Sequence, residues 1–179
     1  MNPNQTKSLR NLTFCALLIA MSIVFSRVLS ISTGFLRFNL GSLPVVLAAV
    51  LFGPAAGFAV GAIADIIGGV LAGYAINPLI TLGAGAIGLF AGIGWCWLPL
   101  RRDSLRLACG ILLGHTVGSI VLNSLALRLF YGYAWSVLAA RIPNALILSV
   151  AEFFLMRALL ANHSLMAAAR GSFTGRRSE

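Results

Sequence analysis

Long apolar stretches separated by short polar breaks make up most of the chain. They cover approximately residues 9–30, 40–52, 55–71, 79–98, 105–131 and 135–160. Most of them reach the roughly 20 residues that an α-helix needs to cross a bilayer. Proline, glycine and charged residues mark the breaks, as at Gly53-Pro54 and Arg101-Arg102-Asp103. The pattern predicts an all-α integral membrane protein, a compact bundle of six transmembrane helices forming one domain over residues 1–179.

The second stretch is shorter than the others. A helix over residues 40–52 would be only about 20 Å long, less than the ~30 Å thickness of the hydrocarbon core. We therefore expect it to tilt into the protein or to be partly re-entrant. Residues 31–39, which precede it, show no helical pattern and are expected to be irregular.

Composition supports the membrane interpretation. Hydrophobic residues make up 59% of the chain and charged residues 9%, whereas an average soluble domain carries about 25% charged residues. A soluble globular domain and a disordered chain are both excluded on this basis. The three cysteines lie within apolar stretches without metal-ligand spacing, so we interpret them as small buried apolar side chains. The N-terminal stretch lacks a signal-peptide cleavage site and is expected to be a retained helix.

The positive charge of the chain predicts its orientation. The chain has 13 basic and four acidic residues and a formal net charge of +9. The basic residues flank apolar stretches, where they orient helices, so a nucleic-acid partner is not expected. The positive-inside rule is satisfied when both termini are cytoplasmic. The cytoplasmic side then holds Lys7, Arg10, Arg101, Arg102, Arg106, Arg157, Arg170, Arg176 and Arg177.

Four arginines remain on the opposite, outer side. Arg27 and Arg141 lie within apolar stretches near their outer ends, and Arg37 and Arg128 lie in or beside outer loops. Charged residues at membrane depth are costly and rarely face lipid. Each of these arginines can snorkel to the interface, or together they can surround an anionic ligand.

Aromatic and amide side chains gather at the same outer ends. A belt of residues at the membrane interface is one explanation. A site for a flat heteroaromatic ligand is the other, because rings can sandwich it, amides can bond its edge and arginines can neutralise its carboxylates. These residues are Phe38, Asn39, Tyr74, Asn77, Asn123, Tyr131, Tyr133 and Trp135.

No motif for catalysis or a cofactor is evident. The only lysine is Lys7, which excludes a phosphate-binding P-loop, and the two histidines are too far apart for a HExxH zinc site. Asp65 lies near the midplane and can either relay protons or tie two helices together, with His115 as a candidate partner. Glu152 is expected to pair with a nearby cation. We predict neither an enzyme nor a bound cofactor.

Small residues recur at every fourth position in several stretches, which lets neighbouring helices approach closely. Three of these groups are expected to pack inside the bundle, whereas the pair Ala16 and Ala20 can also face another protein. The three groups are Gly57 and Gly61; Ala84, Gly88 and Gly92; and Gly110, Gly114 and Gly118.

Several segments carry motifs that point to one family. They are Arg37-Phe38-Asn39-Leu40-Gly41-Ser42-Leu43-Pro44-Val45-Val46-Leu47-Ala48, Leu51-Phe52-Gly53-Pro54-Ala55-Ala56-Gly57, Gly61-Ala62-Ile63-Ala64-Asp65-Ile66-Ile67-Gly68, Leu122-Asn123-Ser124 and Arg141-Ile142-Pro143. In these segments the sequence resembles the substrate-binding (S) components of energy-coupling factor (ECF) vitamin transporters. Within that family it looks most like the folate-specific branch.

The resemblance implies a multi-pass protein of the bacterial cell membrane that captures a vitamin from outside. Its partners would be folate, a transmembrane coupling (T) subunit and two ATPases, which supply the energy. In that family an Ala-x-x-x-Ala pair in the first helix docks on the T subunit, and Ala16 and Ala20 match it. The residues expected to bind the substrate are Arg27, Arg37, Phe38, Tyr74, Asn77, Asn123, Tyr131 and Arg141.

Within this set, we expect Arg27 and Arg141 to pair with the glutamate carboxylates of folate. Asn77 and Asn123 would bond the edge of the pterin ring, and Phe38, Tyr74 and Tyr131 would stack on it. Three alternatives stay open at this point. The same architecture can serve another vitamin, such as pantothenate or a queuine-like base. The chain can also be a stand-alone proton-coupled carrier that uses Asp65, or a membrane assembly factor that binds no small molecule.

Overall fold

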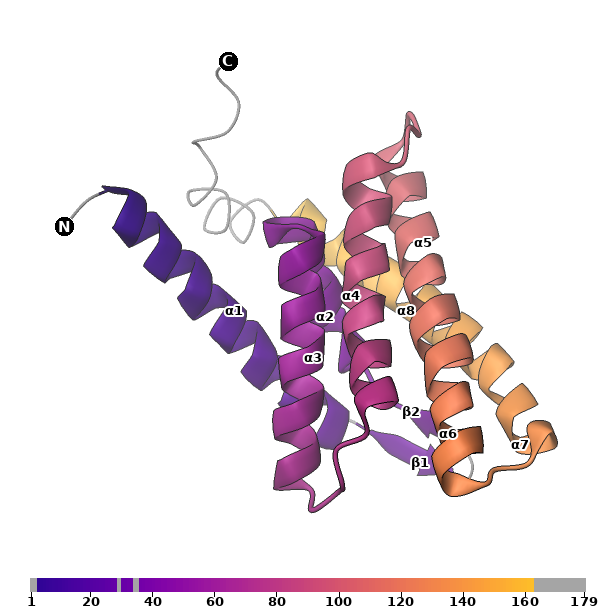
Figure 1. The fold of residues 1–179 in the computed structure, drawn as a ribbon. Helices are drawn as coiled ribbons and strands as arrows, with labels where there is room; N and C mark the ends of the chain where they lie inside the picture. The colour runs from indigo at the N-terminus through magenta and orange to yellow at the C-terminus, as the bar shows by residue number, and fades with distance from the viewer. Residues whose placement is uncertain (1–2, 29, 34–35, 163–179) are drawn as a thin grey trace.

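The computed structural model describes residues 3–28, 30–33 and 36–162 of the chain (Figure 1). Helices account for most of this part, and one small β-hairpin follows the first helix. The elements are α1 (Pro3–Arg27), β1 (Ile31–Thr33), β2 (Leu36–Phe38), α2 (Ser42–Phe52), α3 (Pro54–Leu71), α4 (Pro78–Trp97), α5 (Asp103–Gly114), the π-helix η1 (His115–Leu122), α6 (Asn123–Tyr131), α7 (Trp135–Ala139) and α8 (Arg141–Ala161).

The predicted apolar stretches appear as helices at the expected places. Within the described residues, five helical stretches are long and apolar enough to cross a membrane, and α2 is a shorter apolar helix. Two of the five are composite, because α5, η1 and α6 follow one another directly and α7 leads into α8. The fold is therefore all-helical except for the hairpin.

The prediction of an irregular segment at residues 31–39 was wrong. Strands β1 and β2 pair in antiparallel register, with the Cα atoms of Ile31 opposite Phe38, Ser32 opposite Arg37 and Thr33 opposite Leu36. Strands of three residues are too short to show a period of two that differs from an irregular loop. After the hairpin, the start of α2 lies beside the end of α1, where the Ser22 hydroxyl donates a 2.6 Å hydrogen bond to the carbonyl oxygen of Gly41.

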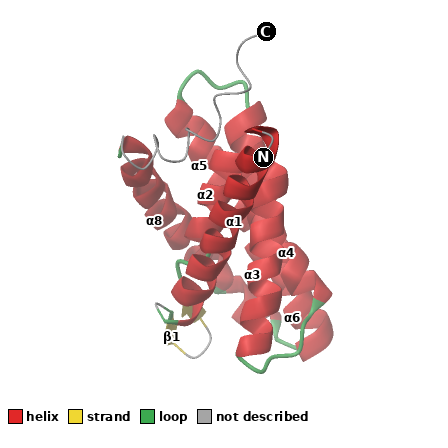
Figure 2. Ribbon diagram, turned by 90° about the vertical axis from the view of Figure 1, so that its left-hand side faces the viewer, coloured by secondary structure: helices red, strands yellow, loops and turns green. Residues whose placement is uncertain are grey.

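The helices run between two ends of the molecule (Figures 1 and 2). One end, called here the hairpin end, carries β1 and β2, the loop between α3 and α4, and the connection from α6 to α7. The other, the terminal end, carries the first turn of α1, the last turn of α8 and the loop between α4 and α5. Helix α1 diverges from the other helices toward the terminal end, so much of its length stands apart from the bundle.

Helix α2 lies at the centre and supplies much of the core. Almost all of its residues are buried, and Val46, Ala48 and Ala49 are fully enclosed. A helix that is apolar all round is expected to be surrounded by other helices. This agrees with the expectation that the short second stretch tilts into the protein.

The glycine stripes bring α4 into direct backbone contact with both of its neighbours. A Cβ atom at Gly57 of α3 would lie 2.8 Å from the carbonyl oxygen of Gly88 in α4. On the other side of α4, a Cβ at Gly110 would lie 2.7 Å from the carbonyl oxygen of Ala91. The prediction that these stripes pack inside the bundle is confirmed.

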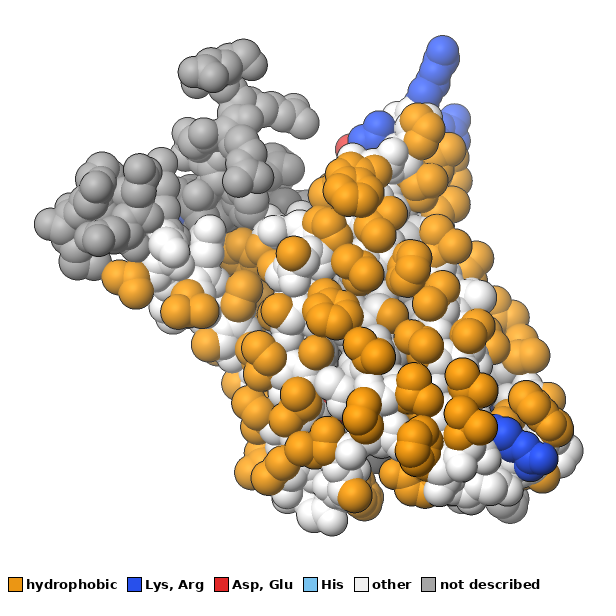
Figure 3. Space-filling model, viewed as in Figure 1, with side chains coloured by type: hydrophobic (Ala, Val, Ile, Leu, Met, Phe, Trp, Pro, Cys, Tyr) orange, Lys and Arg blue, Asp and Glu red, His pale blue; other side chains and the backbone are white. Residues whose placement is uncertain are grey.

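The surface has the distribution expected of a protein in a bilayer. Apolar side chains cover the middle of the face shown in Figure 3, and basic side chains lie at its two ends. Large exposed apolar residues occur on most helices, for example Ile67, Leu82 and Val150. In water such a surface would be unusual for a monomer.

Candidate functional site

Arg27 ends α1 at the hairpin end and connects three elements there. Its Nη2 group donates a hydrogen bond to the carbonyl oxygen of Gly68 in α3. Its guanidinium carbon lies 5.4 Å from the centre of the Tyr74 ring, in the loop that follows α3, which is within cation–π range. Its Nε atom is buried and has no hydrogen-bond partner among the described residues. Arg27 therefore keeps one donor unused.

Arg141 begins α8 and faces the π-helix. Its Nη2 group lies 3.5 Å from the hydroxyl oxygen of Ser119, a long hydrogen bond, and its Nε atom is also buried without a partner. Among the described residues, neither Arg141 nor Arg27 forms an ion pair with a carboxylate. Neither guanidinium charge is thus neutralised by a carboxylate of the described residues.

Asn123 follows η1 as the first residue of α6 and packs against α4. Its Oδ1 atom is buried and has no hydrogen-bond partner in the part of the chain that the structure describes. A Cβ atom at Gly83 would clash with this oxygen, so the glycine makes room for the amide. Buried polar atoms are usually hydrogen-bonded, and an exception suggests a group held for another purpose.

Asn77 has a structural role besides the binding role predicted for it. It is buried and caps α4, with its Oδ1 atom accepting a hydrogen bond of 3.0 Å from the backbone N–H of Leu79. The side-chain oxygen is therefore used by the helix, and its NH₂ group is the part left for a ligand.

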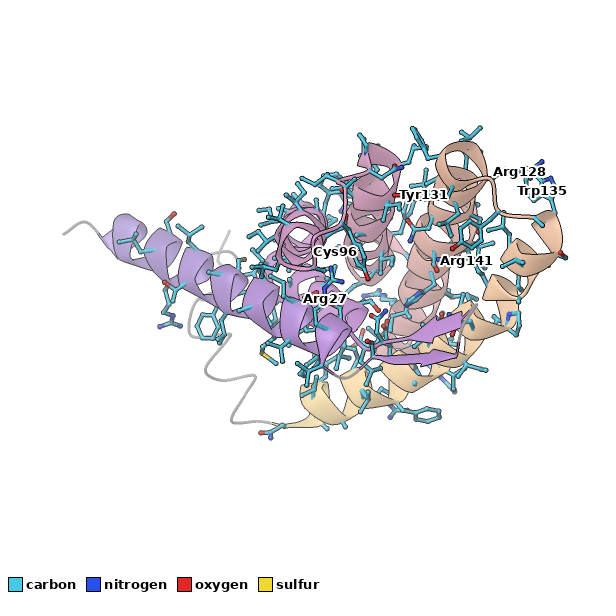
Figure 4. The ribbon with its side chains drawn as sticks, turned by 90° about the horizontal axis from the view of Figure 1, so that it is seen from below. Arg27, Cys96, Arg128, Tyr131, Trp135 and Arg141 are labelled. Atoms are coloured by element: carbon cyan, nitrogen blue, oxygen red, sulfur yellow. The ribbon has the colours of Figure 1, made fainter. Side chains whose placement is uncertain are left out.

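The hairpin-end arginines fall into two groups (Figure 4). Arg27 and Arg141 lie on the inner side of the helices. Arg128 and Trp135 lie at the edge, where the guanidinium carbon is 5.7 Å from the ring centre, and Arg128 also bonds the carbonyl oxygen of Tyr133 at 3.1 Å. Arg128 thus fits the snorkelling interpretation.

Four predicted binding residues remain, two tyrosines and two residues of the hairpin. Tyr74 and Tyr131 are 62% and 51% exposed, so their rings are accessible to a ligand or to the membrane interface. The backbone of Arg37 and Phe38 belongs to β2, and their side chains lie outside the described part of the structure.

Two pockets of the described part lie elsewhere. One opens at the terminal end between Trp95, Ser104 and Arg157, and the other lies on α1 beside Arg10 and Phe14. None of the predicted substrate-binding residues lines either pocket.

The two intramembrane carboxylates each form hydrogen bonds to neighbouring helices. Asp65 accepts a 2.8 Å hydrogen bond from Thr81 in α4, so it ties α3 to α4, but the suggested pairing with His115 was wrong. His115 instead contacts Glu152, with 2.9 Å between Nε2 and Oε2. Glu152 also accepts a hydrogen bond from Ser42.

The proposed docking residues and the cysteines are accessible to different extents. Ala16 and Ala20 are both exposed on α1. All three cysteines are free thiols, as expected, but the prediction that they are buried was wrong for Cys96, which is exposed, and holds only in part for Cys15 and Cys109, which are partly buried.

Sequence reasoning missed Ser119 and Gly83. Ser119 lies four residues before Asn123, and this spacing on one helix face was a signal that could have identified it. Gly83 stands one residue outside the glycine stripe of α4, and only its contact with Asn123 reveals its role.

Comparisons with known proteins agree on one family. Residues 10–160 match the family described as ECF transporter, substrate-specific component. The chain is 29% identical over 133 residues to the folate transporter FolT of Clostridium novyi (strain NT), covering 74% of this chain and 76% of that protein.

Two solved structures share the fold. A crystal structure of FolT bound with folic acid matches with a TM-score of 0.67 and 25% identity, over 89% of this chain and 92% of the other. The S component of a bacterial ECF transporter matches with a TM-score of 0.65 and 20% identity, over 86% and 96%. With its multi-pass helical fold and this family match, the chain belongs to the substrate-specific components of ECF transporters.

Proposed function

We propose that this chain is the folate-binding S component of an ATP-driven importer in the bacterial cytoplasmic membrane. The hairpin end faces the outside and captures folate there. The terminal end faces the cytoplasm, so both termini are cytoplasmic, and the whole chain forms one membrane domain of six helical segments.

The distribution of basic residues supports this orientation. The terminal end carries five described arginines, which lie in the first turns of α1, around the loop between α4 and α5, and in the last turns of α8. The positive-inside rule places the side with more arginine and lysine in the cytoplasm. The five are Arg10, Arg101, Arg102, Arg106 and Arg157.

The observation that carries the proposal is the pair of arginines at the hairpin end. Arg27 and Arg141 each keep a buried Nε atom without a partner, and within the described residues neither meets a carboxylate. Folate brings two glutamate carboxylates, and arginine binds carboxylates through charge-assisted hydrogen bonds. We assign one of these carboxylates to each arginine.

The ring of folate is assigned to the amide and aromatic side chains. The unused Oδ1 atom of Asn123 can accept a hydrogen bond from an amino group of the pterin. Asn77 can donate from its NH₂ group, and Tyr74 and Tyr131 can stack on the rings. Arg37 and Phe38 of the hairpin complete the proposed set.

Transport requires partners that this chain does not provide. No phosphate-binding motif occurs in its sequence, so we assign ATP hydrolysis to two separate ATPases joined to a T subunit. The exposed small residues Ala16 and Ala20 form the proposed docking face on α1, where short side chains permit close helix contact. The chain itself is not an enzyme in this proposal.

Ligand capture from a mixture of three candidate compounds tests the proposal. The purified protein is incubated with an equimolar mixture of folate, pantothenate and queuine, washed in detergent and examined by mass spectrometry. Retention of folate alone supports the proposal, and R128Q protein serves as a positive control because Arg128 lies at the edge. Retention of pantothenate or queuine in place of folate, or of none of the three, contradicts it.

A further inference from the structure

A buried polar network joins three helices beneath the candidate site, and its centre is Glu152 of α8. The side chain of Glu152 is completely buried. Its Oε1 atom accepts a hydrogen bond from the Ser42 hydroxyl of α2, and its Oε2 atom lies 2.9 Å from Nε2 of His115 in η1. His115 is only 2% exposed.

The hydrogen bonds of this network are specific in direction. The Nδ1 atom of His115 is buried, and within the described ranges it has no partner, so a proton placed there would have no described acceptor. With a proton on Nε2, the imidazole donates to Oε2 of Glu152. Glu152 then receives one donor at each oxygen, and removal of either donor leaves a buried acceptor unpaired.

Such a network is a poor source of stability. Burying a carboxylate in a membrane protein is costly, and well-packed apolar residues can often replace buried polar sets without loss of stability. What a buried polar set can provide is one defined arrangement of the elements that it joins. Glu152 can therefore define the relative positions of the helices that it joins.

Each member of the network lies on, or next in sequence to, an element that carries part of the site. Ser42 begins α2 directly after the hairpin, and the preceding Gly41 is held to α1 by a 2.6 Å hydrogen bond from the Ser22 hydroxyl to its carbonyl oxygen. His115 begins η1, which contains Ser119 and leads directly into Asn123. Elements α2, η1 and α8 thus meet at Glu152.

Glu152 and Arg141 also share one face of α8. They are separated by about three helical turns, so their side chains point in nearly the same direction. Arg141 meets Ser119 of η1, and Glu152 meets His115 of the same π-helix. Two contacts therefore fix how α8 is rotated relative to η1, and only one of them would touch a ligand.

We propose that Glu152 is a positioning residue of the substrate site. By holding Ser42 and His115, its carboxylate fixes α8 against the π-helix and the base of the hairpin, and so keeps Arg141 oriented toward the ligand. This inference rests on the proposed function, because it assigns Glu152 to the same site. No proton transfer is required.

The test compares matched variants at temperatures where each is fully folded. Ser42→Ala removes a hydrogen-bond donor to Glu152, and Glu152→Gln replaces the carboxylate by an amide. Ser42→Thr keeps a hydroxyl at this position. Ser149→Ala is the control, because Ser149 is a buried serine of α8 that donates a 2.7 Å hydrogen bond to the carbonyl oxygen of Ala145 in its own helix. Folate Kd is measured for each variant, alone and combined with Arg141→Gln.

We expect Ser42→Ala and Glu152→Gln to weaken folate binding about tenfold, because a hydrogen bond to a charged group is lost. Ser42→Thr and Ser149→Ala should stay within about twofold of the original protein. In the Arg141→Gln background the tenfold losses should vanish, since residues that act through one another are not additive. Wild-type affinity in both network variants overturns the proposal, as do losses that persist unchanged in that background.

A separate measurement distinguishes failure of the proposed folate function from failure of the positioning role of Glu152. If the unmodified protein binds no folate, hydrogen exchange of residues 115–122 in the ligand-free protein decides the positioning role. Faster exchange in Ser42→Ala than in Ser149→Ala supports it, and equal exchange contradicts it. Because Ser42→Ala keeps the carboxylate, the test stands even when Glu152→Gln fails to fold.

Discussion

At the scale of single residues, hydrogen bonding separates structural polar groups from those available to a ligand. Asn77 caps a helix and Asp65 ties α3 to α4 through Thr81. Arg27, Arg141 and Asn123 each keep a buried polar atom without a partner. The first group should therefore matter for stability and the second for binding.

The arginines provide the first prediction. Replacing Arg27 or Arg141 by glutamine should weaken folate binding at least tenfold, because a charge-assisted hydrogen bond to a carboxylate is lost. Arg128→Gln is the matched control at the same end and should change Kd less than about twofold. Isothermal titration of the three variants checks this, and an equal loss in Arg128→Gln would refute the assignment of carboxylate partners.

The two asparagines should respond in opposite ways. Asn77→Ala should lower the free energy of unfolding by about 1 kcal/mol, because the cap of α4 is lost, and Asn77→Asp should retain the cap. Asn123→Ala should leave the melting temperature unchanged and weaken folate binding, because its oxygen serves no helix. Thermal unfolding and titration of each variant give both quantities. A lower melting temperature for Asn123→Ala with unchanged binding would count against its role.

Residue pairings were the part of the site that the sequence predicted least well. Depth along the membrane normal placed Asp65 and His115 at similar levels, and this suggested a contact. Depth does not fix the rotation of a helix or the order of its neighbours. In the structure α4 lies beside α3, so Thr81 reaches Asp65, and His115 faces α8 and Glu152.

At the scale of elements, the apolar stretches were predicted to within a few residues. The period and length of a membrane helix produce a long sequence signal. The hairpin and the π-helix produced none that could be recognised, because the strands have three residues each and a π-turn depends on tertiary contacts. The contacts of η1 with α4 and α8 arise only once the helices are assembled.

Helix spacing can be tested at the contact between α4 and α5. Gly110→Ala should destabilise the protein by about 1–3 kcal/mol, because the added methyl group meets backbone atoms that cannot rotate away. Gly69→Ala is the control, since nothing lies within 4 Å of its added Cβ. Melting temperatures in detergent compare the two, and equal stability would show that α4 and α5 can separate without cost.

At the scale of the whole molecule, α1 is the least embedded of the long helices. In its apolar stretch Ser8–Arg27, 11% of residues are buried, compared with 44% in α4. It leaves the bundle toward the terminal end (Figure 1). A helix that is exposed over much of its length in this way suits contact with another membrane subunit.

The docking face gives a prediction at this scale. Replacing both Ala16 and Ala20 by leucine should prevent the chain from forming a complex with the T subunit and its ATPases, because bulky side chains keep the helices apart. Folate binding by the isolated chain should be unchanged, since the hairpin end is not altered. Ala158→Leu, an exposed alanine of α8, is the control and should preserve the complex. Copurification measures complex yield, and an unchanged yield for the double variant would eliminate this face.

Binding of folate by the isolated chain tests the central claim most directly. Purified protein in detergent is titrated with folate by isothermal calorimetry, with pantothenate as the comparison ligand. The account predicts saturable binding of one folate per chain with a Kd below about 1 μM, which corresponds to about −8.2 kcal/mol, and no binding of pantothenate. Absence of saturable folate binding at micromolar concentrations would contradict it.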